Sequence, residues 1–282
     1  LPTASELKLA TYSLDSAVSF DRRYAAKSRM DVVSKTFTRV AQEILIKQET
    51  TSATLLMTAV AAASTGGRAH VQTNRIVGKF TLADMNDLLT LAKRINTSFI
   101  GGTPTSRTKG LTDIICSPEV VEDLRSIAYN PINAANANDS VAGATDGLPA
   151  PDELRMELYR NAGVPEFYGL GIMEINELGV NEKFNTLFDV AAGSTTYNNP
   201  AGAPAITFNT ATDEFVLGVD RSRDALIRAV AVDDESGGEF NLIADDQYSI
   251  RQNKIGYFGS MEEGRVVLDN RVLVGKIIGA AD

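Results

Sequence analysis

Residues 29–63 read RMDVVSKTFTRVAQEILIKQETTSATLLMTAVAAA, and this stretch decides the fold. It contains neither Gly nor Pro, the residues that most often interrupt a helix. A single helix over this stretch would be about 50 Å long at about 1.5 Å per residue, whereas globular helices average about 11 or 12 residues. The sequence therefore predicts one exceptional helix, ended by the glycines of STGG at 64–67.

The apolar residues of this helix form two stripes rather than one. A polar segment, IKQETTS at 46–52, separates them, and the first stripe stops at Gln48 and Thr51. Since a coiled coil would keep one seam throughout, we expect two different packing surfaces along the helix. The helix is either continuous, with at most a slight kink near Thr50, or two shorter helices with a break at 50–52. The stripes are Met30, Val33, Phe37, Val40 and Ile44, then Ala53, Leu56, Val60 and Ala63.

Composition and charge exclude several classes of protein. The chain has 282 residues, 44% hydrophobic and 22% charged, which is ordinary for a folded domain. No window approaches about 18 consecutive apolar residues, and the long helix carries charges such as Lys35, Arg39 and Glu43. A net charge of −9 argues against a tightly held nucleic acid. One cysteine, Cys116, excludes an intrachain disulfide and a multi-cysteine zinc site.

The rest of the chain mixes helices and strands, which predicts an α+β protein. Residues 7–20 alternate as an extended segment before the long helix. A helix over 81–95 begins with a Thr81–Asp84 capping box, and another follows Ser117 as its N-cap. A third helix is expected over 152–163. Strands are expected at 71–80, 112–117, 164–175, 205–209, 213–220, 247–259 and 264–278, with turns at Gly237-Gly238 and Asp269-Asn270.

No enzyme signature emerges from the candidate chemical groups. A Ser-His-Asp or Cys-His relay needs a histidine, and His70 is the only one in the chain, so no such relay can be assigned from the sequence. Cys116 lies in the apolar run DIIC. The loop at 99–110 lacks the spacing of a P-loop. The acidic clusters 233–235 and 245–246 lack the spacing of an EF-hand and are interpreted as exposed turns. We therefore expect no catalytic, cofactor-binding or metal-binding residues, and an architectural role.

The order of elements resembles the major capsid proteins of tailed bacteriophages, which have the Hong Kong 97-like fold. The segment 21–49 resembles a loop leading into the spine helix of that family. The segments 111–130 and 164–175 resemble a strand, a helix and the next strand of its axial domain, and 250–278 resembles its terminal strands. The likeness covers nearly the whole chain as architecture, without a diagnostic motif.

This resemblance implies a domain organisation. Residues 1–24 would be an N-terminal arm and a short extended loop, and 25–75 a peripheral domain containing the spine helix. Residues 76–205 would be an axial domain, and 206–282 would return to the peripheral domain as C-terminal strands. In this family a phage protease often removes a leading segment, which would make Leu1 a mature terminus.

The resemblance also implies a function and partners. The chain would assemble in the host cytoplasm into hexamers and pentamers of an icosahedral shell, the capsid of the virion. Packaged DNA would lie nearby without sequence-specific binding. Scaffolding, portal or decoration proteins are conceivable partners, and no membrane is involved. Two alternatives remain open: an encapsulin-like protein compartment, and an α+β enzyme or ligand-binding domain whose site is not recognisable.

Two segments are expected to contact neighbouring subunits. The stretch NAANANDSVAGATDGLPAP at 133–151 is too poor in apolar residues to fold against its own core, and we expect it near the capsomer centre. The N-terminal stretch 1–15 has alternating apolar residues, which need a surface to pack against, so we expect it to reach a neighbouring subunit.

Overall fold

The computed structural model describes residues 9–23, 31–96, 110–129, 166–167, 169–198, 205–232, 238–245 and 253–279. The chain forms two compact units, both built from separated segments. Unit 1 contains Leu1–Leu55 and Leu226–Leu268, and unit 2 contains Leu56–Ala225 and Asp269–Asp282. The predicted division into arm, peripheral and axial domains places its boundaries elsewhere and stays a prediction.

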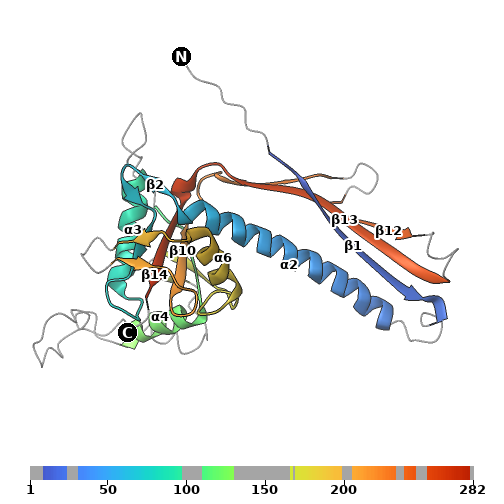
Figure 1. Ribbon diagram of the computed structural model, residues 1–282, viewed down its shortest axis with the longest axis horizontal. Helices are drawn as coiled ribbons and strands as arrows, with labels where there is room; N and C mark the ends of the chain where they lie inside the picture. Colours follow the sequence, from blue (N-terminus) through green and yellow to red (C-terminus); the bar gives the residue numbers. More distant parts are fainter. Residues whose placement is uncertain are drawn as a thin grey trace, which may run out of the picture. The chain divides into compact units, whose positions relative to one another are not determined.

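The long helix is continuous, as the sequence predicts. Helix α2 runs over Asp31–Ala61, 31 residues, and passes through 50–52 without interruption (Figure 1). Its buried residues also change face along its length, with Val40 and Ile44 buried in the first half and Ala53 and Val60 in the second. The alternative of two separate helices is therefore wrong.

Hydroxyl groups explain why the polar segment of α2 stays helical. The side chains of Thr50, Thr51, Ser52 and Thr54 each donate a hydrogen bond to the carbonyl four residues earlier, at 2.7–2.9 Å. Serine and threonine disfavour helices mainly because they offer the backbone competing bonds. Here those bonds are made within the helix, so the polar segment does not break it.

One expectation about α2 is corrected. The first stripe was predicted to stop at Gln48, but this side chain is buried and continues the stripe. Its amide Nε2 donates to Glu263 Oε2 at 3.2 Å. A polar residue can therefore face the core here because a buried acceptor lies opposite it.

Unit 1 contains a four-stranded antiparallel sheet beside α2 (Figure 1). Strand β13 (Lys254–Val267) is central and pairs with β1 (Tyr12–Asp21) along one side. Along its other side it pairs with β11 (Leu226–Val230) and β12 (Asn241–Asp245). Leu14 and Met261 from the sheet pack against Val40 and Ile44 of α2, which forms the core of this unit.

Strand β13 also corrects the prediction of separate strands at 247–259 and 264–278. It continues through both Gly259 and Gly264, which the sequence suggested as breaks. A Cβ at Gly259 would lie 2.5 Å from the Phe240 ring, and one at Gly264 would lie 2.9 Å from the carbonyl oxygen of Ala10. These glycines therefore admit close neighbours rather than turns.

Unit 2 contains a six-stranded mixed sheet. Its order is β4-β14-β10-β5-β7-β6, with parallel pairs β4/β14 and β5/β7 and antiparallel pairs elsewhere. Strand β14 lies between β4 and β10, so the end of the chain joins residues 71–73 and 214–219. The strands are β4 (Val71–Thr73), β5 (Asp113–Cys116), β6 (Glu166–Phe167), β7 (Leu170–Glu174), β10 (Glu214–Val219) and β14 (Leu273–Ile278).

The remaining elements of unit 2 are short. Two small antiparallel pairs join β2 (Ser64–Thr65) to β3 (Arg68–Ala69) and β8 (Thr196–Tyr197) to β9 (Ile206–Thr207). The turn expected at Asp269-Asn270 is a 3-10 turn, η2 (Asn270–Val272), whose N-cap Asp269 accepts a bond from the Arg271 backbone.

Two helices of unit 2 begin with the predicted caps. Helix α3 (Leu82–Asn96) follows Thr81, whose N–H and hydroxyl both donate to Asp84 Oδ2, at 2.9 and 2.6 Å. Helix α4 (Pro118–Tyr129) follows Ser117, whose Oγ accepts from the Val120 N–H at 3.3 Å. These two helices bury their apolar faces against β5, β10 and β14 in the larger core. Helix α6 (Lys183–Ala192) was not predicted, and the helix expected at 152–163 lies outside the described residues.

Candidate interaction surface

His70 is buried in unit 2 and joins the hairpin at 64–69 to residues 270–273. Its Nε2 lies 2.8 Å from Thr65 Oγ1, and its Nδ1 lies 3.1 Å from the carbonyl oxygens of Asn270 and Leu273. Because two carbonyls can only accept, Nδ1 carries the proton and Nε2 accepts from the threonine in the neutral ring. The residue therefore has a satisfied structural position.

The stability of unit 2 is expected to fall as the pH decreases through the His70 titration. Burial lowers the pKa of His70 below its usual 6.5, although the carbonyls of Leu273 and Asn270 act in the opposite direction. The unfolded chain thus binds a proton at higher pH than the folded chain. The contribution of His70 to the free energy of unfolding is therefore fully present above pH 6.5, and it declines below that pH until the folded histidine also takes up a proton.

Denaturant unfolding of unit 2 between pH 5 and 8 measures this effect. His70 is the only histidine in the chain, so His70→Gln is expected to flatten the pH dependence around 6.5. An unchanged slope in that variant would show that another group is responsible.

Cys116 is inert in this environment. It is fully buried at the end of β5, and burial together with the carboxylates of Glu174 and Glu214 raises the pKa of its thiol to about 12. A thiol with this pKa is protonated at neutral pH and is a poor nucleophile. The predicted structural role of Cys116 fits this geometry.

The other sequence candidates fall largely outside the described residues, namely 99–109, 133–151, 233–235 and Asp246. Within the described ranges no group of three or more His, Cys, Asp or Glu side chains is arranged to hold a metal ion. None of the described helices is long and apolar enough to cross a membrane.

Exposed apolar side chains are concentrated in unit 1. Of the fourteen large apolar residues that are exposed in the described part of the chain, ten belong to this smaller unit. A contiguous exposed apolar patch often marks an interaction site, and among these residues Phe258 and Ile243 are paired neighbours on one face of the sheet. The ten residues are Leu45, Ile46, Leu226, Ile227, Val232, Phe240, Leu242, Ile243, Phe258 and Leu268.

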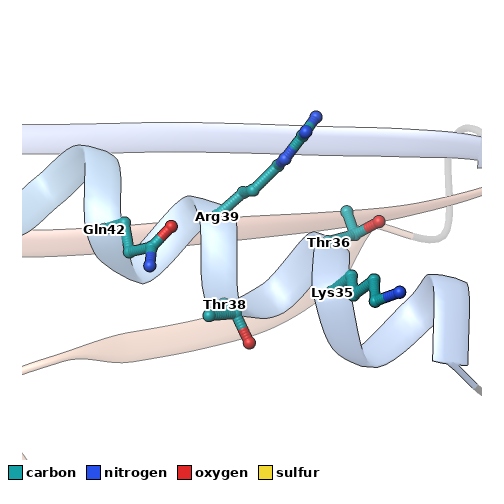
Figure 2. Close-up of a pocket in the computed structure, with 5 residues that line it drawn as sticks. All are labelled: Lys35, Thr36, Thr38, Arg39 and Gln42. Atoms are coloured by element: carbon teal, nitrogen blue, oxygen red, sulfur yellow. The ribbon is translucent and has the colours of Figure 1, made fainter.

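One face of α2 carries a shallow basic groove. Figure 2 shows its five lining residues on about two turns of the helix. Lys35 and Arg39 are both exposed and are four residues apart, so they lie on one face of the helix. Two turns beyond Arg39 on the same side of α2 lies Ile46, which is 55% exposed. The groove is lined by Lys35, Thr36, Thr38, Arg39 and Gln42.

The face of the sheet that points away from α2 is acidic at one end and apolar further along. Leu14 and Met261 face the helix, so the alternating neighbours of each face the other side. The pairing register places Ser13 beside Glu262 and Asp15 beside Ser260. Two residues further along, Phe258 pairs with both Ala17 and Ile243. A second groove, which includes Glu239 and Glu262, opens on this face.

A buried charge cluster ties α2 to the sheet between these two faces. The fully buried Glu263 accepts from Arg228 Nε at 2.9 Å, Arg265 Nη2 at 3.1 Å and the Tyr12 hydroxyl at 2.8 Å. Burial alone would raise the pKa of Glu263, but hydrogen bonds from Arg265, Arg228 and Tyr12 lower it. The carboxylate is therefore ionised at neutral pH and, with Gln48, joins β1, β11, β13 and α2.

Sequence reasoning missed the interaction surface, although a signal was present. The predicted stripe on the first half of α2 needs Ile44 only, yet the sequence continues as Ile44-Leu45-Ile46. Three consecutive apolar residues cannot all face one surface on a helix with 3.6 residues per turn. The two additional residues indicate a second contact on the outer side of α2.

Comparison with known proteins identifies the fold. By sequence, the chain matches no protein-family model and no curated protein. By structure, it resembles the capsid of a native GTA particle with a TM-score of 0.54 and 11% identity, covering 96% of this chain and 74% of that one. The cyanophage P-SCSP1u capsid aligns with a TM-score of 0.52, 16% identity, and coverage of 96% and 72%. The Helicobacter pylori bacteriophage KHP30 capsid aligns with a TM-score of 0.52, 9% identity, and coverage of 96% and 76%.

These similarities extend over nearly the whole chain, so they describe its complete architecture rather than a shared motif. The chain has the α+β, Hong Kong 97-like fold that its sequence suggested, with a long helix near its start.

Proposed function

We propose that this chain is the major capsid protein of a tailed bacteriophage and assembles into an icosahedral shell around phage DNA. The observation that carries the proposal is the likeness to phage capsid structures over 96% of the chain. The exposed apolar surface of unit 1 supports it, since a shell subunit needs contacts with several neighbours. The role is structural and involves no catalysis or cofactor.

Assembly of the purified chain tests this function. We expect particles of megadalton mass, visible by negative-stain electron microscopy and built from hexamers and pentamers. Sedimentation only as a 30.2 kDa monomer or small oligomer, also with a scaffolding protein present, would reject the proposal. Particles from infected cells are expected to protect DNA from nuclease. Particles that hold protein cargo and no nucleic acid would favour an encapsulin-like compartment instead.

The predicted domain division enters the proposal in the form that the sequence suggested. Residues 25–75 and 206–282 form the peripheral domain with α2 as its spine, 76–205 form the axial domain, and 1–24 form the arm and extended loop. The two compact units support a discontinuous arrangement, because each combines early and late segments. They divide the chain differently at 56–75, 206–225 and 269–282, since β14 lies between β4 and β10.

The polar segment 133–151 is proposed to contact other copies at the capsomer centre, and 1–15 to reach a neighbouring subunit. Deletion of residues 135–147 is expected to lower the yield of shells at least about tenfold while the isolated chain keeps its circular dichroism spectrum. Shell yield is measured by sedimentation. Unchanged yield and thermal stability of the shells would remove this segment from the interface without affecting the proposed function.

A further inference from the structure

Strand β1 forms one edge of the four-stranded sheet in unit 1, and in the described part of the chain no strand pairs with its outer edge. It pairs residue for residue with β13 along the other edge, over all ten residues of Tyr12–Asp21 and without a bulge. It contains neither Pro nor Lys. Proteins usually protect an exposed edge with such residues, with a bulge or with a short strand, because a free edge can pair with another chain. A long and regular edge therefore indicates a partner.

The hydrogen bonds of β1 show which of its residues point to the free edge. In an antiparallel pair, every second residue bonds to the partner strand, and the residues between point their backbone groups away from it. The Arg22 N–H donates to the Asn253 carbonyl at 3.1 Å, in the register of β1 and β13. Even-numbered residues of β1 therefore bond to β13, and odd-numbered residues point to the free edge. The five N–H groups at the free edge donate to no backbone carbonyl of the described residues. They belong to Ser13, Asp15, Ala17, Ser19 and Asp21.

Helix α2 lies over the face of the sheet and reaches its central strand β13. The ring centroids of Phe37 and Tyr257 are 4.7 Å apart, and Gln48 Nε2 donates to Glu263 on the same strand. The side chains at 13, 15, 17 and 19 alternate with those that face α2, and they are exposed. A strand of another molecule can therefore be added to β1 in the plane of the sheet.

We propose that β1 pairs with β1 of a second copy, antiparallel about a twofold axis at Ala17, so that two four-stranded sheets become one continuous sheet. The direction of the edge groups restricts the register, because only an odd-numbered residue can lie on the axis and bond to its own copy. With Ala17 on the axis, residues 13–21 of the two strands pair. Ser13 then lies opposite Asp21, and Asp15 lies opposite Ser19.

The side chains are complementary in this register. Each aspartate meets a serine hydroxyl, which can donate a hydrogen bond to the carboxylate, and the two alanines on the axis are small. On the face toward α2, Leu14 lies opposite Phe20. Moving the axis to Asp15 would place that carboxylate against its own copy, which is unfavourable, and moving it to Ser19 would shorten the pairing.

The opposite edge of the sheet fits β1 less well than a second β1 does. That edge is divided between β11 and β12, which have five residues each. Neither can pair with the whole of β1. The inference rests on the proposed function only for the place of the contact in a shell. Adjacent subunits of one pentamer or hexamer are not related by a twofold axis, so the contact would join subunits of neighbouring capsomers.

A cysteine on the axis tests both the contact and its register. Ala17→Cys brings two thiols together, because the Cα atoms of a hydrogen-bonded antiparallel pair are about 5.5 Å apart, within the range of disulfides. The matched control is Ser13→Cys, which is exposed on the same face of β1 but lies about 26 Å from its own copy in this register. After mild oxidation and non-reducing electrophoresis, we expect disulfide-linked dimers from Ala17→Cys and monomers from Ser13→Cys. Cys116 does not compete, because it is buried and its thiol has a pKa of about 12.

A backbone variant tests the strand pairing without a new thiol. Ala17→Pro removes an N–H that does not bond to β13, so the ladder between β1 and β13 is retained. Both hydrogen bonds between the two copies of residue 17 are lost, and self-association is expected to weaken at least about tenfold. Sedimentation velocity measures the association, and hydrogen exchange of β13 peptides checks that the sheet is intact.

The outcomes separate this contact from folding and from the proposed function. Monomeric Ala17→Cys overturns the inference, as do equal dimer yields from the two cysteine variants or normal association of Ala17→Pro. If β13 loses its protection from exchange in the proline variant, the cysteine pair alone decides. Shells that form without the Ala17→Cys cross-link remove this contact and leave the proposed function standing. Cross-linking of a chain that forms no shells retains the contact and removes the proposed function.

Discussion

Replacing Glu263 with alanine is expected to lower the free energy of unfolding of unit 1 by about 3 kcal/mol. The carboxylate is completely buried and receives hydrogen bonds from Arg228, Arg265, Tyr12 and Gln48. Its removal leaves the two guanidinium groups without their shared acceptor and Gln48 facing a cavity. The arginines are 39% and 17% exposed, so water recovers part of the loss, and the expected cost lies at the lower end for a broken buried ion pair.

Hydrogen exchange of peptides from β1 and β13 measures this loss within unit 1. The matched control is Glu262→Ala on the same strand, whose side chain is exposed and whose change is expected to stay within about 0.5 kcal/mol. Equal effects of the two substitutions would show that the cluster contributes no more than a surface carboxylate.

The Glu263 cluster also predicts acid sensitivity. The folded pKa of Glu263 lies below its usual 4.5, so the unfolded chain takes up the proton first as the pH falls. The contribution of Glu263 to the free energy of unfolding is fully present above about pH 4.5 and is lost progressively as the pH falls below it. The alanine variant should therefore approach the stability of the original chain in acid.

The sequence predicted local features of the fold well because their causes are local. The absence of Gly and Pro over 29–63 decides the long helix, and the caps at Thr81 and Ser117 act within three residues of themselves. The alternation in 7–20 likewise gave the face of β1 that packs on α2, with Leu14 buried.

Features that depend on distant residues were not predictable in this way. Gln48 looked like the end of an apolar stripe because its acceptor, Glu263, lies 215 residues further along the chain. Gly259 looked like a strand end because the ring that requires it, Phe240, belongs to another segment. The candidate surface has the same origin, since the pairing of β1, β12 and β13 brings Asp15, Glu262 and Phe258 onto one face.

Replacing Lys276 with methionine is expected to lower the free energy of unfolding of unit 2 by about 3–5 kcal/mol. This lysine lies in the fully buried strand β14, and its Nζ is 3.2 Å from both Asp84 Oδ1 and Asp87 Oδ2. Methionine fills a similar volume, so the loss comes from the unpaired carboxylates rather than from a cavity. Arg75 still neutralises Asp87 through a pair at 2.6 Å, but Asp84 is completely buried and loses its cation.

A double variant distinguishes this electrostatic cost from a packing defect. Lys276→Met combined with Asp84→Asn removes both buried charges, and we expect it to be more stable than the sum of the two single losses by at least about 1 kcal/mol. Lys79→Met, at an exposed position, is the control and is expected to change stability by less than about 0.5 kcal/mol. Additive losses in the double variant would contradict the buried pair. Coupling between the two substitutions would show that a lysine in an otherwise apolar terminal strand is kept for its carboxylate partners, and that α3 and β14 depend on each other through this contact.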